Sequence, residues 1–455
     1  MTATERSAFD PTTVEAFHYV GLDVRRNRHS LTLRCRYALD KLGFEEQIDI
    51  LVPPHDSPAD DTAIGAAARL VYLLAGVSYF KAAAPLVIEV PDGLNPSERE
   101  LVSANYHHGL GEYAFRNQID LSRLSIEAPD ARAVPLTAPT GERGPLVAFG
   151  GGIDSIVTVE GLRRHTDDLA LLVVSRSGDR FEAIERAAAE TGLPVLRGER
   201  ALDPKILRSS ELGFRNGHVP ITGILSAVAV LTALVAGRDS VVMSNESSAS
   251  SGNVEWNGQI VNHQWSKTLE FEDLFRAAIR SSIPGAPDYF SWLRSRSELW
   301  VAESFARLDR YHPVFRSCNR AFHQDPAHRL DRWCGQCDKC AFVDLILSPF
   351  VEAATLRSIF DGREPLDDPA QEHRFLTLLG LTPDAKPFEC VGDVDECRAA
   401  VVLAAQRDDR AGSVLLGRLA AEASTRQADV DPNRLLAPLG PHRVPARYAP
   451  PDLLV

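Results

Sequence analysis

The chain has 455 residues, of which 44% are hydrophobic and 24% are charged, and this is the composition of a globular protein with two or three domains. Its formal net charge of −13 argues against a general nucleic-acid-binding surface, because phosphate contacts rely on clustered Lys and Arg side chains. Residues 1–17 lack the basic and apolar segments of a secretory signal. We therefore expect a cytoplasmic protein without a nucleic-acid or membrane partner.

Residues 1–140 predict an N-terminal α+β domain. Alternating polar and apolar residues at 29–37 and 47–52 are typical of half-buried antiparallel strands. An Ala-rich helical stretch follows at 61–84, and a strand-like run at 85–93. The segment 135–145, rich in Pro, Gly and Thr, is the first linker that the composition indicates.

The pattern changes between residues 145 and 350. Short apolar runs at 146–149, 169–175 and 240–245 are typical of strands covered on both faces, and a helical stretch at 180–192 lies between them. The apolar run 221–237 is too short and too polar for a membrane span, so we expect a buried helix there. Strands that alternate with helices predict an α/β domain with a doubly wound parallel sheet. Residues 351–455 predict a mainly helical region with an extended tail.

Three consecutive glycines follow the first of these apolar runs, in the sequence LVAFGGGIDSIV from Leu146 to Val157. Glycine permits positive φ and lets a ligand approach the main chain, and N–H groups at a strand-to-helix junction favour an anion. Asp154 is placed to meet a metal ion or a ribose, and Ser155 can donate to a phosphate oxygen. The spacing is neither that of a Walker A motif nor GxGxxG. We expect nucleotide binding by Gly150, Gly151, Gly152, Asp154 and Ser155.

This loop resembles the S-G-G-x-D-S pyrophosphate loop of the adenine-nucleotide α-hydrolases, which include GMP synthetase, asparagine synthetase and the queuosine nitrile synthase. The resemblance implies a HUP-type sheet and the cleavage of ATP between its α and β phosphates, which activates a substrate as an adenylate. Gly150 stands where the family usually has Ser, so one hydroxyl contact is lost while the backbone cradle is kept.

A cysteine cluster forms the second strong motif. WCGQCDKC carries the spacing C-x2-C-x2-C, and a fourth cysteine lies upstream. Four thiolates can enclose a tetrahedral Zn²⁺ and leave no open position, so the pattern predicts a structural zinc site; an iron–sulfur cluster is the alternative. The expected ligands are Cys318, Cys334, Cys337 and Cys340. The remaining thiols are interpreted as a core residue, Cys35, and as unrelated thiols, Cys390 and Cys397.

The segment 244–275 is unusually polar for a region that follows a core strand. Polar loops at the carboxyl end of a parallel strand build substrate sites in α/β folds, so we expect a site here rather than a solvated loop. The candidates are Glu246, Glu255, His263 and Lys267, together with His218 just ahead of the buried helix.

The GGGIDS loop, GHVP, the segment NESSASSGN…VNHQWSK and the CGQCDKC cluster together resemble the UDP-N-acetyl-α-D-muramoyl-L-alanyl-L-glutamate epimerases of bacterial peptidoglycan synthesis. This resemblance implies an isomerase that uses ATP and Mg²⁺ to invert the terminal L-glutamate of UDP-MurNAc-L-Ala-L-Glu. Adenylation of the α-carboxyl group would neutralise it and make the α-carbon acidic, so that a base and an acid can act on opposite faces. The five candidates above would serve as base, acid or carboxylate clamp. If residues 263–267 are helical, His263 and Lys267 share one face.

Two other functions fit parts of the pattern. A queuosine nitrile synthase-like or tRNA-modifying ligase shares the loop and the cysteine cluster, but the sequence has no basic stripe with interleaved aromatic residues. The second is a non-catalytic nucleotide-binding protein with the same fold. The replacement of the usual Ser by Gly150 favours this alternative. The sequence predicts neither the oligomeric state nor the role of residues 351–455.

Overall fold

The computed structural model describes residues 9–51, 59–323, 325–425 and 430–450. Residues 1–8, which belong to the segment interpreted as lacking a signal, lie outside this range. The regular structure is built around one large sheet and a separate hairpin of β10 (Val254–Trp256) and β11 (Gln259–Val261). The strands of the large sheet are β1 (Ala16–Arg26), β2 (Ser30–Leu39), β3 (Leu42–Leu51), β4 (Val87–Glu89), β5 (Ser125–Glu127), β6 (Leu146–Ala148), β7 (Ala170–Arg176), β8 (Val195–Ala201), β9 (Ser240–Met243) and β12 (Asp288–Ser291).

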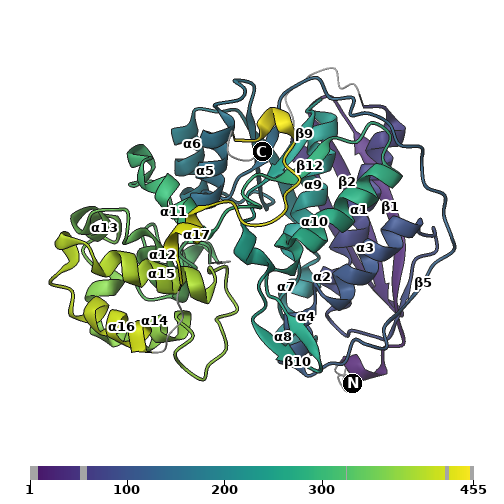
Figure 1. The fold of residues 1–455 in the computed structure, drawn as a ribbon. Coiled ribbons are helices and arrows are strands. Elements are labelled where there is room, and N and C mark those ends of the chain that lie inside the picture. The colour runs from purple at the N-terminus through teal and green to yellow at the C-terminus, as the bar shows by residue number, and fades with distance from the viewer. Residues whose placement is uncertain (1–8, 52–58, 324, 426–429, 451–455) are drawn as a thin grey trace.

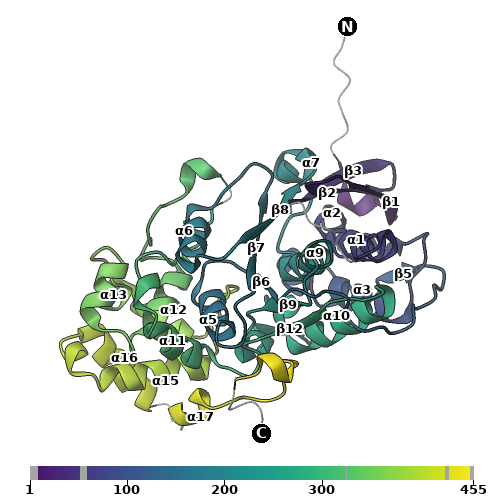
Figure 2. The same ribbon diagram turned by 90° about the horizontal axis from the view of Figure 1, so that it is seen from above.

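These strands form a ten-stranded sheet within the described residues, in the order β12-β9-β6-β7-β8-β3-β2-β1-β4-β5 (Figures 1 and 2). β1, β2 and β3 make an antiparallel meander, as expected for the alternating segments at 29–37 and 47–52. β2 buries every second side chain along most of its length, which is the period of a strand with one face on the core. The predicted helical stretch at 61–84 forms α1 (Asp61–Ala75) and α2 (Val77–Phe80).

The other half of the sheet is parallel. β12, β9, β6, β7 and β8 all run in one direction. The helices α5 (Ile153–Leu162) and α6 (Glu182–Thr191) cover one face, and α9 (Ile221–Val235) and α10 (Leu269–Ser282) cover the other (Figure 2). Covering on both faces explains the continuous apolar runs, and all four residues of β9 are buried. The prediction of an α/β fold with helices wound on both faces of a mostly parallel sheet is confirmed, and the HUP type stays a prediction.

A single antiparallel pairing joins the two halves. Residues 47–51 of β3 pair with residues 197–201 of β8, so the sheet continues without a break from the N-terminal region into the parallel part. The buried Arg200 crosses this junction and donates from Nε to Oε1 of the buried Glu46 at 2.7 Å. The domain boundaries expected from the sequence stay a prediction.

The described residues that follow β12 contain helices and no further strand of the sheet. The helices α13 to α16 gather in a lobe beside the sheet (Figure 1). α15 packs against α11, α12 and α16, which ties this lobe to the parallel half. The bounds are α11 (Glu298–Ala306), α12 (Asp338–Leu347), α13 (Ala353–Ile359), α14 (Glu372–Leu378), α15 (Val394–Ala405), α16 (Val414–Thr425) and α17 (Pro432–Leu436). The remaining helices are α3 (Pro96–His107), α4 (Gly111–Asn117), α7 (Pro204–Leu207) and α8 (Ser209–Leu212).

Among the described residues, the helical stretch Asp61–Phe80 is long and apolar enough to cross a bilayer by length and composition alone. Its most apolar window is 83% buried inside the protein, which is the environment of a core helix. α9, the helix expected at 221–237, is shorter and is buried along almost its whole length, as predicted.

Candidate active site

The glycine loop connects β6 to α5 and requires glycine at its centre. Gly151 has φ of +74°, and a Cβ there would lie 3.1 Å from the carbonyl oxygen of Ala183. Gly152 is the N-cap of α5, so the free N–H groups of the first turn point out of the helix beside it. Gly150 differs, since a Cβ at this position would meet nothing within 4 Å. The loop therefore leaves open space in front of a helix N-terminus, the arrangement that suits an anion.

A cavity of about 420 Å³ opens in front of this loop. It lies at the carboxyl ends of β6 and β9, the neighbouring strands from which the chain winds in opposite directions, and ligands of open α/β sheets bind at such a point. Three cationic side chains line it, those of Lys267, Arg316 and Lys339. The other lining residues are Ala148, Phe149, Gly150, Gly152, Asp154, Ser155, Leu172, Val174, Ile184, Thr222, Leu225, Met243, Ser244, Asn245, Ser317, Phe322 and Cys390.

Three carboxylates meet behind the loop. Asp154 in α5, Glu246 after β9 and Glu298 in α11 place one oxygen each within 4.8 Å of one another. Glu246 and Glu298 are both 3% exposed, and burial together with the charge of Glu246 raises the pKa of Asp154 to about 7. Oδ1 of Asp154 and Oε2 of Glu298 are buried and have no hydrogen-bond partner among the described residues. Buried oxygen ligands of this kind fit a hard divalent cation such as Mg²⁺.

Two histidines lie together beside a carboxylate from the N-terminal region. Nδ1 of His263 is 2.5 Å from Oε2 of Glu112 in α4, and the rings of His218 and His263 are 4.2 Å apart. Burial and the neighbouring His263 lower the pKa of His218 to about 4. Burial also disfavours the charge of His263, but Cys390 and Glu112 outweigh it and raise its pKa to about 9. One imidazole of the pair is thus held as a cation and the other as a neutral base.

Lys267 lines the cavity beside the thiol of Cys390, which the sequence did not single out. Nζ of Lys267 donates to Oε1 of Gln264 at 3.1 Å and to Sγ of Cys390 at 3.2 Å. Nζ of Lys339 donates to the carbonyl oxygen of Cys390. Cys390, interpreted from the sequence as an unrelated thiol, lines the cavity, whereas Cys397 is buried in α15.

The structure brings four of the five sequence-predicted candidates into one neighbourhood and leaves one outside it. Lys267 lines the cavity, Glu246 meets the lining residue Asp154, and the pair His218–His263 lies beside the lining residue Cys390. Glu255 is exposed on the hairpin β10–β11. Residues 263–267 do not form one helix; Trp265–Lys267 is a single 3-10 turn. His263 and Lys267 nevertheless both interact with Cys390.

Five residues of this neighbourhood that carry a charge or a thiol escaped the sequence analysis, and Arg316 of the cavity wall is one of them. Glu112 and Glu298 occupy helices without a local motif, and only the tertiary fold brings them to the site. Lys339 lies inside the cysteine motif, between Cys337 and Cys340. A basic residue between two metal ligands was the sequence signal that could have identified it as a candidate site residue. Cys390 lacked a paired cysteine spacing, which is why it was interpreted as unrelated.

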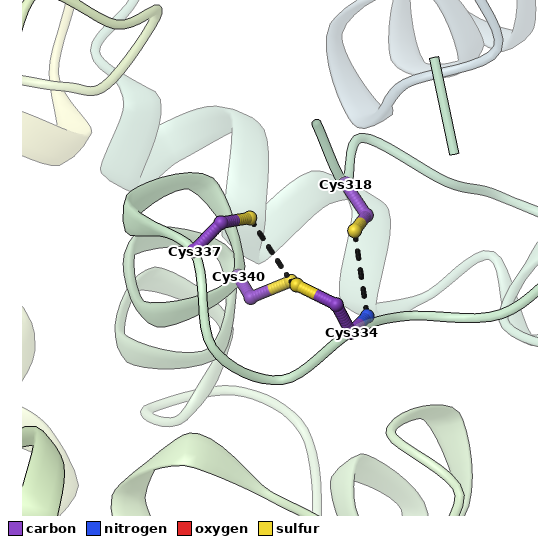
Figure 3. Close-up of side chains that lie close together, drawn as sticks. All are labelled: Cys318, Cys334, Cys337 and Cys340. Atoms are coloured by element: carbon purple, nitrogen blue, oxygen red, sulfur yellow. Dashed lines mark hydrogen bonds between the residues drawn. The ribbon is translucent and has the colours of Figure 1, made fainter. Parts of the chain in front are cut away.

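The four cysteines of the predicted metal site come together beside this cavity's outer wall, where Ser317 precedes Cys318. Cys337 is the N-cap of α12 and Cys340 lies in its first turn, while Cys318 and Cys334 approach from loops, so that the sulfur atoms face one another (Figure 3). All four Sγ atoms lie within 4.8 Å of one another, and Sγ of Cys340 is 3.6 Å from Sγ of Cys334 and 3.4 Å from Sγ of Cys337. Four sulfurs around a tetrahedral Zn²⁺ at about 2.3 Å would be separated by about 3.8 Å, so the arrangement fits that ion.

Two family models match successive parts of this chain. The model of the MurL N-terminal domain matches residues 8–292, and that of the MurL C-terminal domain matches residues 314–433. The chain belongs to the MurL family. A protein of Salinispora tropica, named UDP-N-acetyl-alpha-D-muramoyl-L-alanyl-L-glutamate epimerase, is 41% identical over 411 residues, which cover 89% of this chain and 88% of that protein.

Two further relatives carry the same name. The protein of a Micromonospora species is 40% identical, over 89% of this chain and 90% of its own. That of Xanthomonas oryzae pv. oryzae is 39% identical, over 96% and 97%. Epimerases are isomerases, so membership of the MurL family confirms the predicted enzyme class. The predicted resemblance is confirmed as well, over nearly the whole chain.

Proposed function

We propose that the protein is an ATP- and Mg²⁺-dependent epimerase that inverts the terminal L-glutamate of UDP-MurNAc-L-Ala-L-Glu to D-glutamate through an acyl-adenylate, in the synthesis of peptidoglycan precursors. The named MurL relatives support the substrate. The observation that carries the use of ATP is the cavity, in which a glycine loop at a helix N-terminus faces three cationic side chains and borders three clustered carboxylates.

In this proposal the loop N–H groups and Ser155 bind the departing diphosphate. Lys267, Arg316 and Lys339 offset its charge, which is the main requirement of phosphoryl and adenylyl transfer. Asp154, Glu246 and Glu298 would hold Mg²⁺, which neutralises phosphate charge and orients the nucleotide. The apolar walls formed by residues such as Leu172 and Val174 suit a flat base.

Activation explains why an epimerase would use ATP at all. A free carboxylate opposes removal of its own α-hydrogen, because a second negative charge would develop beside the first. Adenylation removes that charge, and a base and an acid can then exchange protons at the α-carbon. Hydrolysis of the adenylate releases AMP and the D-glutamyl product.

The cysteine cluster is proposed as a structural Zn²⁺ site, since four protein ligands leave no position for substrate. The proposal includes a cytoplasmic location, where UDP-linked precursors and ATP are available. It assigns no nucleic-acid or membrane partner.

The decisive experiment is chiral analysis of glutamate after incubation of the protein with UDP-MurNAc-L-Ala-L-Glu, ATP and Mg²⁺, with diphosphate release followed in parallel. We expect D-glutamate and AMP to form together, and neither to form without ATP. Unchanged L-glutamate with intact ATP would end the proposal. Diphosphate release with a deazaguanine carboxylate instead would indicate the nitrile synthase reaction, and nucleotide binding without turnover would indicate a sensor.

Asp154→Asn tests the carboxylate cluster with almost no change in size. We expect nearly complete loss of diphosphate release, because the charge that faces the metal is removed, together with an unchanged circular dichroism spectrum. Asp167→Asn is the matched control, since Asp167 is exposed just beyond the end of α5. Equal activity of the two variants would contradict the metal role.

A further inference from the structure

The thiol of Cys390 has an environment that neither the zinc cluster nor nucleotide binding requires. It lies between α14 and α15, is half-buried, and lines the cavity together with Gly150, Asp154 and Ser155. Cys397 differs, because it is a fully buried cysteine of the apolar core and burial is the main cause that raises the pKa of its thiol. Cys390 instead stands at the boundary between the cavity and the polar cluster that surrounds it.

Two lysines from separate elements donate hydrogen bonds to this one residue. Lys267 donates to Sγ at 3.2 Å, and Lys339 of α12 donates to the carbonyl oxygen, which fixes the backbone. His263, which is held by Glu112 of α4, also favours the charged form of the thiol. A cysteine beside a histidine that is oriented by a carboxylate is the arrangement by which proteins hold a reactive thiolate.

The charges around the sulfur favour its ionised form. Burial raises the pKa of a thiol, but Lys267, His263 and Lys339 outweigh it here and lower the pKa of Cys390 to about 6. A group with this proton affinity is a thiolate at neutral pH and can accept a proton within the range in which acid–base catalysis is efficient.

From this geometry we propose that Cys390 is a catalytic residue that exchanges the α-proton of the activated glutamate, with His263 and Lys267 as its positioning residues. This inference rests on the proposed function. The Cα–H bond breaks, its proton passes to Sγ and turns the thiolate into a thiol, and its electron pair is delocalised into the acyl carbonyl group. A solvent-derived proton delivered to the opposite face completes the inversion.

Three measurements on Cys390→Ser and Cys390→Ala test this role: substrate-dependent exchange of diphosphate into ATP, uptake of solvent deuterium at the glutamate α-carbon of the product, and inversion. We expect inversion and deuterium uptake to fall at least about 100-fold, the lower end of what a positioned acid–base group contributes. Diphosphate exchange should stay within about threefold of the wild type. Serine keeps the size and the contact with Lys267 but not the proton affinity, so a merely structural thiol would be rescued by serine and an acid–base thiol would not.

Cys397→Ala is the matched control, because it removes the buried thiol of the fourth residue of α15, which does not line the cavity. It should leave all three measurements within about threefold. Inversion by Cys390→Ala at a wild-type rate would overturn the inference. So would a parallel loss of exchange and inversion, or the glutamyl group found covalently attached to Cys390 after quenching. If the wild type itself neither exchanges diphosphate nor inverts glutamate, the proposed function fails first.

Discussion

Gly150 and Gly151 are neighbours in the sequence, but the structure gives them different constraints. Only Gly151 combines positive φ with a close backbone neighbour, at +74° and 3.1 Å, whereas the side of Gly150 is open. The family usually has Ser where this chain has Gly150. The replacement removes one hydroxyl group from the cavity surface but does not change the backbone conformation of the anion-binding turn.

Gly150→Ser and Gly151→Ser form a matched pair for this distinction. We expect Gly150→Ser to fold normally and to bind ATP within a few-fold of the wild type, because the new side chain enters open space. Gly151→Ser should lose at least about 1 kcal/mol of stability to the left-handed conformation, and most of its ATP affinity. Titration calorimetry and thermal unfolding measure both effects, and similar behaviour of the two variants would contradict the assigned loop geometry.

The ionisation of Cys390 can be followed without any substrate. Alkylation requires the thiolate, so its rate should rise as pH increases through about 6 and be flat above pH 7, whereas an ordinary thiol reacts faster up to about pH 9. The charged and titratable groups that act on it are Lys267, His263, Lys339, Asp154 and the neighbouring Glu389. Iodoacetamide labelling resolved by cysteine provides the measurement, with Cys35 and Cys397 as unreactive references since burial raises the pKa of both thiols. Maximal reaction of Cys390 only above pH 8 would contradict the assigned environment.

At the scale of elements, α15 positions several parts of the site at once. Its N-cap Asp393 forms a capping box with Glu396, and Oδ2 of Asp393 accepts from Ser251 of the polar segment at 2.6 Å. Oε1 of Glu396 accepts from the backbone N–H of Glu298 at 2.9 Å. The start of one helix therefore fixes the segment that carries Cys390 and the helix that carries a carboxylate of the cluster.

Asp393→Ala should lower the free energy of unfolding by about 1 kcal/mol, which is the usual cost of losing an N-cap. Asp393→Asn is its control, because Asn caps helices almost as well and differs mainly in charge. Urea denaturation of both variants gives the comparison. A loss of stability in Asp393→Asn as large as that in Asp393→Ala would mean that charge, and not capping, is the contribution of this residue.

At the scale of the whole molecule, the pairing of β3 with β8 joins the antiparallel and parallel halves of the sheet. The ion pair of Glu46 and Arg200 is buried at this junction, with exposed fractions of 0% and 8%. Removal of one partner leaves a charge in the interior with no compensation, which costs far more than the pair itself contributes. The junction thus depends on both partners being present together.

Glu46→Leu should lower the free energy of unfolding by about 3–5 kcal/mol, and the double variant Glu46→Leu, Arg200→Met should recover most of that loss. Chemical denaturation of the single and double variants measures the coupling. If the double variant is as unstable as Glu46→Leu, the loss comes from packing and not from the unpaired guanidinium.

The metal site is also a property of the whole molecule, since its cysteines join the loop after α11 to the first turn of α12. We expect about four sulfur ligands at about 2.3 Å by X-ray absorption, bound zinc by elemental analysis, and a lower Tm after treatment with a strong chelator. Iron with acid-labile sulfide in place of zinc would establish the cluster alternative.

The sequence alone determined the local features whose physics acts over a few residues. Side-chain alternation predicts the strands, and a continuous apolar run predicts the buried helix α9. The backbone freedom of glycine predicts the Gly-Gly-Gly turn, and the number of thiol ligands predicts the metal site. Each of these signals lies within about twenty residues of sequence. The family itself followed from such segments.

Only the tertiary structure decided which distant side chains meet. Glu112, Glu298, Lys339 and Cys390 come from four different helices or loops, and Glu255, although close in sequence to the other candidates, lies outside the site. The strand β8 likewise gains an antiparallel partner from residues more than a hundred positions earlier. Long-range packing brings these groups together. A short-range sequence pattern cannot predict their proximity, because burial and charge pairing depend on the whole fold.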